Sequence, residues 1–258
     1  MSNNQMVVLG STSAIATRLL PTLDFHQTKI LAFDRLESAH HLGKYIPIEN
    51  QYRCNWDKAS EVETFISMIL TERISHPVLV LNFMGSFGQI KRIDELDIDS
   101  VLLTNSINLM PFFLAAKISK CLPAGSKIIS FSGAGVGGNN LDDSSFGYLA
   151  AKASMAVTIE SIDQQLSKHG VRYGLIAPGA FPSKMQEAVA KDLSGSIPAG
   201  RVARAKEVIE SNPSITKLGR LVHFLSENPE MLGGRTWSAN FDELTEHPGN
   251  FGRLRRIY

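Results

Sequence analysis

The chain has 258 residues, of which 43% are hydrophobic and 20% are charged, a balance that is ordinary for one globular domain with a sizeable core. Its net charge of +1 creates no field strong enough to attract nucleic acid or a membrane surface. The two cysteines, Cys54 and Cys121, have neither metal-ligand spacing nor the pattern of a disulfide framework. No basic N-terminal segment leads into an apolar run, and no run approaches the roughly 20 residues of a spanning helix. We therefore expect a cytoplasmic, reduced protein without a bound metal.

The first predicted strand, residues 6–9, is followed by a turn of small and hydroxyl residues and then by a helical pattern. Such a unit points backbone N–H groups at a phosphate, near the positive end of the helix dipole. The usual dinucleotide turn has three glycines, but here alanines take the last two of the three positions. A plain joint between a strand and a helix is the alternative. The candidate phosphate-binding residues are Gly10, Ser11, Thr12, Ser13, Ala14 and Ile15.

The second predicted strand, residues 29–33, leads into Asp34 and Arg35. An acid about 20 residues after the glycine turn, at a strand end, is suited to the ribose 2′-hydroxyl of NAD and would repel the 2′-phosphate of NADP. Arg35 tempers this preference because a guanidinium can bind that phosphate, and Asp34 can also simply begin a loop. At the third strand end, Trp56 is either a wall of an adenine pocket or part of the core. We expect NAD, with NADP possible.

The rest of the chain alternates strands and helices. Further strands are predicted at residues 77–82, 127–131, 171–177 and 235–240, and helices at 59–70, 100–121, 148–168 and 218–225. The run at 77–82 is continuously apolar, as a central parallel strand requires. Residues 197–204 are expected to begin as a loop. The alternation predicts an α/β fold with a three-layer doubly wound parallel sheet, the Rossmann fold, in a single domain spanning residues 1–258.

Ser132, Tyr148 and Lys152 suggest acid–base chemistry in the second half of the chain. Tyr148 and Lys152 are one helical turn apart, so their side chains share a face. A positive charge beside a phenol favours the phenolate, so the pKa of Tyr148 is expected to fall from about 10 toward neutrality. Ser132 follows an apolar strand and is placed to hydrogen-bond the same substrate oxygen. By itself this motif is weak, since any amphipathic helix can contain it by chance.

With these motifs in this order, the chain resembles the short-chain dehydrogenase/reductase family over nearly its whole length. The resemblance implies an oxidoreductase that transfers a hydride between NAD(P) and a carbonyl or hydroxyl group of a small substrate. Ser132, Tyr148 and Lys152 match the family's catalytic trio, and Asn108 matches the asparagine that holds a water of the proton relay. Tyr148 and Lys152 also contact the cofactor in this reading. The other cofactor-binding positions implied by the resemblance are Asn55, Asn82, Phe83, Met84, Gly85, Pro178, Gly179, Phe181 and Ser183. Asn55 stands where the family often has an aspartate that contacts adenine, and Phe83 and Met84 depart from the family's Asn-Asn-Ala-Gly segment.

Several phrases, among them FSGAGVGG, APGAFPSKM and GRTWSANFDEL, are similar to a branch of the family found among bacterial surface-polysaccharide and nucleotide-sugar genes. This likeness implies a sugar or nucleotide-sugar substrate. The alternatives are a sugar epimerase or dehydratase that retains its NAD, and a non-enzymatic nucleotide sensor on the same fold. The resemblance also implies a substrate lid at residues 184–214. The lid's basic residues either meet a phosphate or form a solvated face; they are Lys184, Arg201, Arg204 and Lys206.

A homo-oligomer is expected, either a dimer or a tetramer, built on the helices that begin near residues 100 and 148. The second of these helices carries an apolar stripe beyond Tyr148, and the first is apolar over much of its circumference. One sheet face cannot cover both sides of such helices, and a two-fold axis would bury the remainder. The alternative is that the lid and the C-terminal arm cover the stripe within one chain. The stripe consists of Met155, Ile159, Ile162 and Leu166.

Overall fold

The computed structural model describes residues 5–23, 29–34, 48–53, 60–61, 63–64, 74, 76–133, 145–192, 195 and 197–240. In this part of the chain seven strands form one sheet in the order β3-β2-β1-β4-β5-β6-β7, with every neighbouring pair parallel. The predicted doubly wound α/β fold is therefore confirmed. The strands are β1 (Gln5–Leu9), β2 (Lys29–Asp34), β3 (Ile48–Arg53), β4 (Val78–Asn82), β5 (Lys127–Phe131), β6 (Arg172–Ala177) and β7 (Thr236–Ser238).

The strand order reverses direction between β1 and β4. From β1 the chain proceeds outward to β2 and β3, and from β4 it proceeds the other way to β7. In open parallel sheets, ligands bind at the carboxyl ends of the strands beside such a switch point. The candidate residues are therefore expected at the carboxyl ends of β1 and β4 and of the strands beside them.

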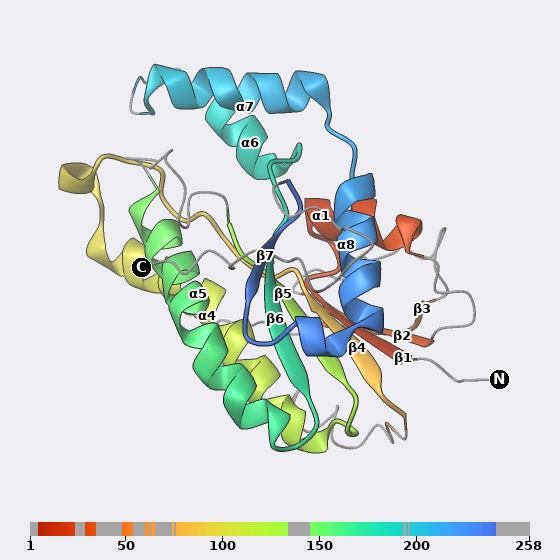
Figure 1. Ribbon diagram of the computed structural model, residues 1–258. Helices are drawn as coiled ribbons and strands as arrows, with labels where there is room; N and C mark the ends of the chain where they lie inside the picture. The colour runs from red at the N-terminus through yellow and green to blue at the C-terminus, as the bar shows by residue number, and fades with distance from the viewer. Residues whose placement is uncertain are drawn as a thin grey trace.

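Helices cover both faces of the sheet, which gives the predicted three layers (Figure 1). On one face lie α1 (Ala14–Leu19), η1 (Leu20–Thr22), α8 (Thr216–Glu227) and η4 (Pro229–Met231). On the other lie α4 (Ile98–Ile118), η3 (Ser119–Cys121) and α5 (Phe146–Ser167). The short turn η2 (Ile93–Glu95) precedes α4.

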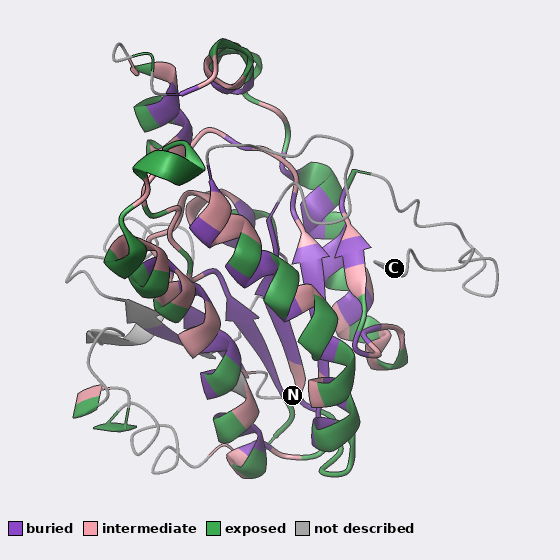
Figure 2. Cartoon of the chain, turned by 90° about the vertical axis from the view of Figure 1, so that its left-hand side faces the viewer, coloured by how far each residue is buried: buried purple, intermediate pink, exposed green. Residues whose placement is uncertain are grey.

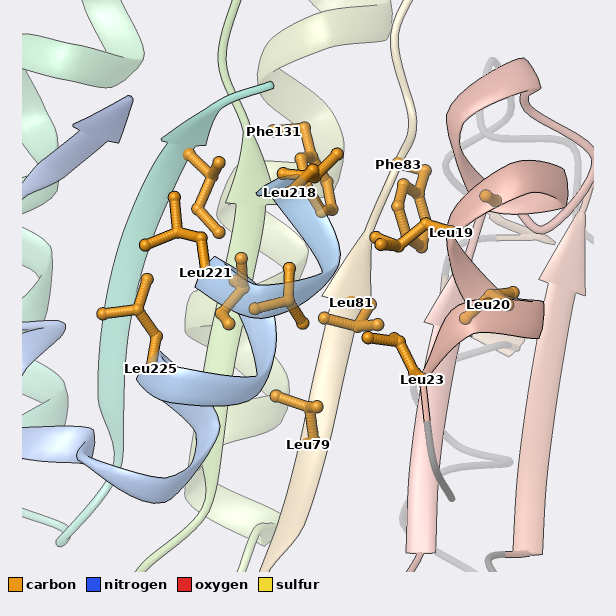
Figure 3. Close-up of a cluster of buried hydrophobic side chains, with 14 of the residues drawn as sticks. Leu19, Leu20, Leu23, Leu79, Leu81, Phe83, Phe131, Leu218, Leu221 and Leu225 are labelled. Carbon is orange, nitrogen blue, oxygen red and sulfur yellow. The ribbon is translucent and has the colours of Figure 1, made fainter. Parts of the chain in front are cut away.

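The α1/α8 face encloses a cluster of buried leucines and aromatic rings, shown in Figure 3. Leu19 and Leu221 enter it from the two helices, and Leu81 enters it from the sheet. The rings of Phe83 and Phe131 stack at its upper end, with centroids 4.5 Å apart. These rings follow β4 and end β5, so the core extends to the level of the candidate site.

The α4/α5 face encloses the second cluster and corrects one expectation. Met155, Ile159 and Leu166 are 1%, 1% and 5% exposed and pack against the sheet, and Ile162 packs at their edge. The stripe predicted to lie at a subunit interface is thus the inner face of α5, because β5 and β6 present enough apolar surface to cover it. Figure 2 looks onto this layer from outside and shows exposed and half-buried residues along the two long helices.

The segment Ile98–Cys121 has the length and apolar composition of a membrane span. No segment of that kind was expected from the sequence. Its inner side nevertheless lies in the core, where Phe112 and Ile118 are fully buried. Such a core helix of a globular fold meets the same criteria of length and composition. Its outer side leaves Leu102, Leu103 and Phe113 between 52% and 62% exposed.

Two helices beyond the end of β6, α6 (Lys184–Ala190) and α7 (Ala199–Ser211), stand apart from the three layers in Figure 1. They pack on each other through Val189, Ile197 and Ala205, with Ile90 at the edge of this small cluster. Residues 197–204 were expected to begin as a loop, and Ile197 and Pro198 do precede α7, which starts at Ala199.

A buried polar ladder joins β4, β5 and β6. Tyr173 Oη and Ser130 Oγ are 2.6 Å apart, and Asn82 Nδ2 donates to Ser130 Oγ at 2.9 Å. Burial raises the pKa of the Tyr173 phenol well above its usual range, so the hydroxyl is neutral. The Asn82 Oδ1 atom accepts from the Met84 N–H and so fixes the backbone that follows β4.

Replacing Tyr173 by phenylalanine should therefore destabilise the protein by about 1 kcal/mol, the net value of one neutral hydrogen bond. The remaining Asn82 donor keeps Ser130 satisfied, so the loss should not be larger. Urea unfolding followed by circular dichroism measures this change. A midpoint equal to that of the parent protein would show that the ladder does not contribute to stability.

Candidate active site

The predicted residues gather at the carboxyl ends of β1, β4, β5 and β6. Gly10 follows β1 with a φ of +75°, a left-handed conformation that favours glycine. A Cβ there would lie 3.0 Å from Met84 Cγ and 3.1 Å from the Met84 backbone nitrogen. Only a glycine therefore lets the turn after β1 approach the segment after β4 this closely.

The rest of the turn after β1 forms the start of α1. Ser13 is the N-cap residue, and its hydroxyl accepts from the Ala16 N–H at 3.1 Å. Ser11 is fully buried, Thr12 and Ile15 are half-buried, and Ile15 packs against the apolar cluster under α1. The strand–turn–helix unit predicted from the sequence is therefore present, with Ala14 as its first helical residue.

The predicted cofactor residues after β4 and β6 have two kinds of environment. The side chains of Phe83 and Phe181 are 8% and 9% exposed and belong to the apolar core. They therefore support the strand ends, and the backbone is what they offer to a ligand. Ser183 caps α6 and accepts from the Gln186 N–H at 3.2 Å. Gly179 has a φ of +91°, which bends the chain after the buried Pro178.

The remaining adenine-side predictions are only partly covered. Asp34 is the last residue of β2, as expected, and its backbone pairs in register with Arg53 of β3. Nothing is described of its side chain. Arg35, Asn55 and Trp56 lie outside the described residues.

The four predicted catalytic residues converge. A Cβ added to Gly85 would lie 2.9 Å from Asn108 Oδ1 and 3.4 Å from Lys152 Nζ, so both polar groups border the same backbone. A Cβ added to Gly133 would overlap the Tyr148 phenol, so the residue after Ser132 lies directly against that ring. The ends of β4 and β5 and the helices α4 and α5 thus bring these groups to one place.

Two of these groups present buried polar atoms to the site. Ser132 Oγ and Asn108 Oδ1 are buried, and neither has a hydrogen-bond partner among the described residues. The Asn108 amide nitrogen is held by the Ser86 carbonyl at 2.8 Å and the Thr104 carbonyl at 2.7 Å. Asn108 Oδ1 is therefore the atom of this side chain that can accept a hydrogen bond from a ligand or a water. Buried polar atoms without partners are costly, so they mark a place built for a ligand or for water.

Lys152 is held inside the protein. It is 3% exposed, and its ammonium donates to the Phe131 carbonyl at 2.9 Å. Burial lowers the pKa of Lys152 to about 8, since taking a charge out of water disfavours the charged form. The lysine is thus still mainly charged at neutral pH.

The expectation for the pKa of Tyr148 was wrong. Burial raises the pKa of Tyr148 to about 12, and the charge of Arg201 opposes the rise. Lys152 Nζ lies 5.6 Å from the centre of the tyrosine ring and is bound to a carbonyl, so its charge does not dominate. The one-turn spacing predicted a shared helix face correctly but did not predict how deeply that face is buried.

Two residues near the phenol had no clear signal in the sequence. Phe87, from the segment after β4, stacks on Tyr148 with centroids 4.3 Å apart and an angle of 10° between the planes. The Arg201 guanidinium carbon lies 5.9 Å from the centre of the Phe87 ring. Arg201 had been named only as one of four basic lid residues, and Phe87 lies in a loop without any motif.

The comparisons with known proteins agree with this fold. A family model described as enoyl-(acyl carrier protein) reductase matches residues 26–226. No curated protein matches the sequence. Among solved structures, a short chain dehydrogenase family protein from Francisella tularensis is 16% identical, with a TM-score of 0.72 over 92% of this chain and 97% of that one.

Two further structures are equally distant in sequence. A short-chain dehydrogenase/reductase from Saccharomyces cerevisiae is 16% identical, with a TM-score of 0.75 over 92% of this chain and 96% of that one. A xylitol dehydrogenase with bound NAD⁺ is also 16% identical, with a TM-score of 0.75 over 92% and 97%. At such low identity these structures establish the fold, whereas the family model spans most of the sequence. The chain therefore belongs to the short-chain dehydrogenase/reductase family of oxidoreductases, which act on CH–OH and C=O groups.

Proposed function

We propose that the protein is an NAD-dependent oxidoreductase that interconverts a carbonyl and a hydroxyl group of a small sugar or nucleotide-sugar. The observation that carries this proposal is the pairing of Ser132 and Tyr148 at the end of β5. A buried hydroxyl without a described partner lies one residue from a backbone that touches the phenol. Two O–H groups placed around the same residue, Gly133, suit a carbonyl oxygen that gains negative charge.

In this mechanism a nicotinamide bound at the strand ends would supply the hydride to the carbonyl carbon, or accept it in the reverse direction. Tyr148 donates its proton to the carbonyl oxygen, and Ser132 donates a hydrogen bond to the same atom. The high pKa of Tyr148 keeps the phenol in the proton-carrying form that reduction needs. Lys152 contributes a positive charge next to the ring. The phenolate left by the transfer takes back a proton through Lys152, and a water held at Asn108 Oδ1 replaces the proton that Lys152 gives up.

The strand ends support binding of a nicotinamide cofactor. The ends of β1 and β4 approach each other so closely that only a glycine fits at Gly10. The switch point of the sheet, where such folds bind ligands, lies between these two strands. We propose NAD rather than NADP because Asp34 ends β2, where a carboxylate repels a 2′-phosphate.

Titration of the protein with NADH and with NADPH tests this preference. We expect tighter binding of NADH, and we expect Asp34→Asn to narrow the difference. A clear preference of the parent protein for NADPH would refute the assignment.

The activity is tested by following NADH oxidation with a panel of keto-sugars and nucleotide-keto-sugars. Net turnover that is lost in Ser132→Ala supports the proposal. Interconversion of sugars without net NADH consumption would favour an epimerase or dehydratase that retains its NAD. Tight binding of NAD without any turnover would favour a nucleotide sensor. An enoyl thioester belongs in the same panel because of the family model's description, and its reduction would redirect the substrate class.

The activity should fall at alkaline pH because of Lys152. Below a pH of about 8 the lysine carries its charge, and above this pH it loses the charge to which we assign a role. The kcat/KM for NADH, measured with a saturating carbonyl substrate, reports groups of the free enzyme. It should be level from about pH 6 to pH 7.5 and fall about ten-fold per unit well above pH 8.

The matched control is Lys184→Met, which removes an exposed lysine at the start of α6. This variant should keep the inflection near pH 8. A profile that stays level to pH 10 in the parent protein would contradict the role given to the Lys152 charge.

We propose a homodimer that uses the outer sides of α4 and α5, with a tetramer as a further possibility. Leu102 and Phe113 are 62% and 54% exposed and lie about three turns apart on one side of α4. Val157 of α5 is 52% exposed. Exposed apolar side chains on two neighbouring helices favour a two-fold contact.

Light scattering coupled to gel filtration should give a mass of at least twice 28.3 kDa. The double variant Leu102→Glu, Phe113→Glu should shift the protein to the monomer. Ile93→Glu is the control, because Ile93 is 68% exposed but lies outside both helices. A parent protein that is monomeric at micromolar concentration would rule the dimer out.

We also propose that α6 and α7 form the substrate lid predicted at residues 184–214, and that the protein is cytoplasmic. The lid proposal is supported by the contact of Arg201 from α7 with Phe87, which stacks on Tyr148. The location is an expectation from the sequence alone.

A further inference from the structure

A layered contact links the lid to the proton donor. The Tyr148 ring lies on the Phe87 ring with centroids 4.3 Å apart, and the Arg201 guanidinium carbon lies 5.9 Å from the centre of Phe87. These residues come from α5, from the segment after β4 and from α7. Elements distant in the sequence are therefore brought together around the phenol, and the cation among them, Arg201, comes from α7.

Arg201 differs from the other basic residues of the lid. Lys184, Arg204 and Lys206 are exposed at the surface. Arg201 is only partly exposed and lies on the inner face of α7, since Ala205 and Val208 follow it by one and two turns and are buried. The helix is held in this orientation by its packing on α6.

A second observation places the charge of Arg201 near the reacting proton. The rise in the pKa of Tyr148 that burial causes is opposed by Arg201. Lys152 Nζ, although one turn from Tyr148 on the same helix, donates to the Phe131 carbonyl. Arg201 is thus a second cation near the phenol, and it comes from α7.

We infer that Arg201 binds an anionic group of the substrate, a phosphate or a carboxylate, close to the carbonyl that Tyr148 protonates. A guanidinium presents a planar fork of donors that matches both anions. Its contact with an aromatic face keeps that fork oriented, and Phe87 fixes its position relative to the phenol. The inference rests on the proposed oxidoreductase function and narrows it to anionic substrates.

Binding and turnover must be measured separately, so that a failure of the inference is distinguishable from a failure of the proposed function. The binding experiment uses Tyr148→Phe protein with NADH, which prevents proton transfer. The probes are a keto-hexose, its phosphate monoester and a keto-hexonic acid of the same chain length. Titration calorimetry gives a Kd for each. We expect at least one anionic probe to bind ten-fold or more tightly than the neutral sugar, and the tighter of the two identifies the anion.

The added substitution Arg201→Gln should remove that preference while leaving the Kd of the neutral sugar unchanged. The matched control Arg204→Gln removes an exposed cation of the same helix and should keep the preference. Equal Kd values for all three probes, or a preference that survives Arg201→Gln, would overturn the inference. These outcomes do not depend on turnover, whose absence with every probe would count only against the proposed reaction.

Turnover of protein that retains Tyr148 distinguishes substrate binding by Arg201 from a purely electrostatic effect of Arg201 on the phenol. If Arg201 binds the anion, Arg201→Gln should raise KM for the anionic substrate and leave the neutral one unaffected. If Arg201 acts only by lowering the pKa of Tyr148, kcat should fall equally for both substrates, and the inference would be wrong.

Discussion

Replacing Tyr148 by phenylalanine should lower turnover by at least roughly 100-fold while the protein still folds and binds NADH. The substitution removes one hydroxyl and leaves the ring, so the stacking on Phe87 and the packing of α5 are retained. The loss of a general acid raises the activation barrier by about 2.7 kcal/mol for each 100-fold. Steady-state kinetics with the best carbonyl substrate measure it, and titration with NADH confirms that the cofactor still binds.

Tyr173→Phe is the matched control for this substitution. It removes another buried phenol hydroxyl, but that hydroxyl bonds to Ser130 inside the sheet. This variant should keep its turnover and lose about 1 kcal/mol of stability, the reverse of the Tyr148→Phe result. Turnover of Tyr148→Phe within ten-fold of the parent value would contradict the assignment of Tyr148 as the proton donor.

The strands could be predicted from the sequence because a buried strand is recognised by the residues of its own short segment. Residues 78–82 are all buried and read as a continuous apolar run, the pattern of a central parallel strand. Residues 127–131 gave a strand with the bounds that the structure has, and Ser132 follows it. The chain alternation then placed Gly10, Gly85 and Ser132 at the same edge, because parallel strands have their carboxyl ends together.

What the sequence did not reveal depends on contacts between distant segments. The stripe at Met155 and Ile159 has the spacing of an apolar face, but spacing does not say whether the sheet or another subunit covers it. Phe87 is a site residue only because the loop after β4 packs against α5, a contact between distant segments. The pKa of Tyr148 likewise depends on burial by several elements, and no spacing of two residues on one helix predicts it.

The other large effect concerns the ion pair that ties α5 to β6. Asp163 is 6% exposed, and its carboxylate accepts from Arg172 Nε at 3.1 Å, from Arg172 Nη2 at 2.9 Å and from the Tyr173 N–H at 2.8 Å. Asp163→Ala would leave a buried N–H without an acceptor and a guanidinium, 29% exposed, without its counter-ion. Breaking such a pair from one side costs about 3 kcal/mol. For a chain of this size the expected fall in Tm is on the order of 10 °C.

Two companion variants separate the causes of that loss. Asp163→Asn keeps an oxygen that can accept from the Tyr173 N–H, so its cost should be smaller than that of Asp163→Ala, and the difference between the two reports the backbone hydrogen bond. Asp94→Ala breaks an exposed pair, in which Arg92 and Asp94 are 69% and 65% exposed, and should change stability by less than about 0.5 kcal/mol. Calorimetric melting of the three variants decides the matter. Equal Tm values for Asp163→Ala and Asp94→Ala would contradict this prediction. The buried pair would then contribute no more to stability than a surface pair, because water would replace the lost carboxylate at both Arg172 and the Tyr173 N–H.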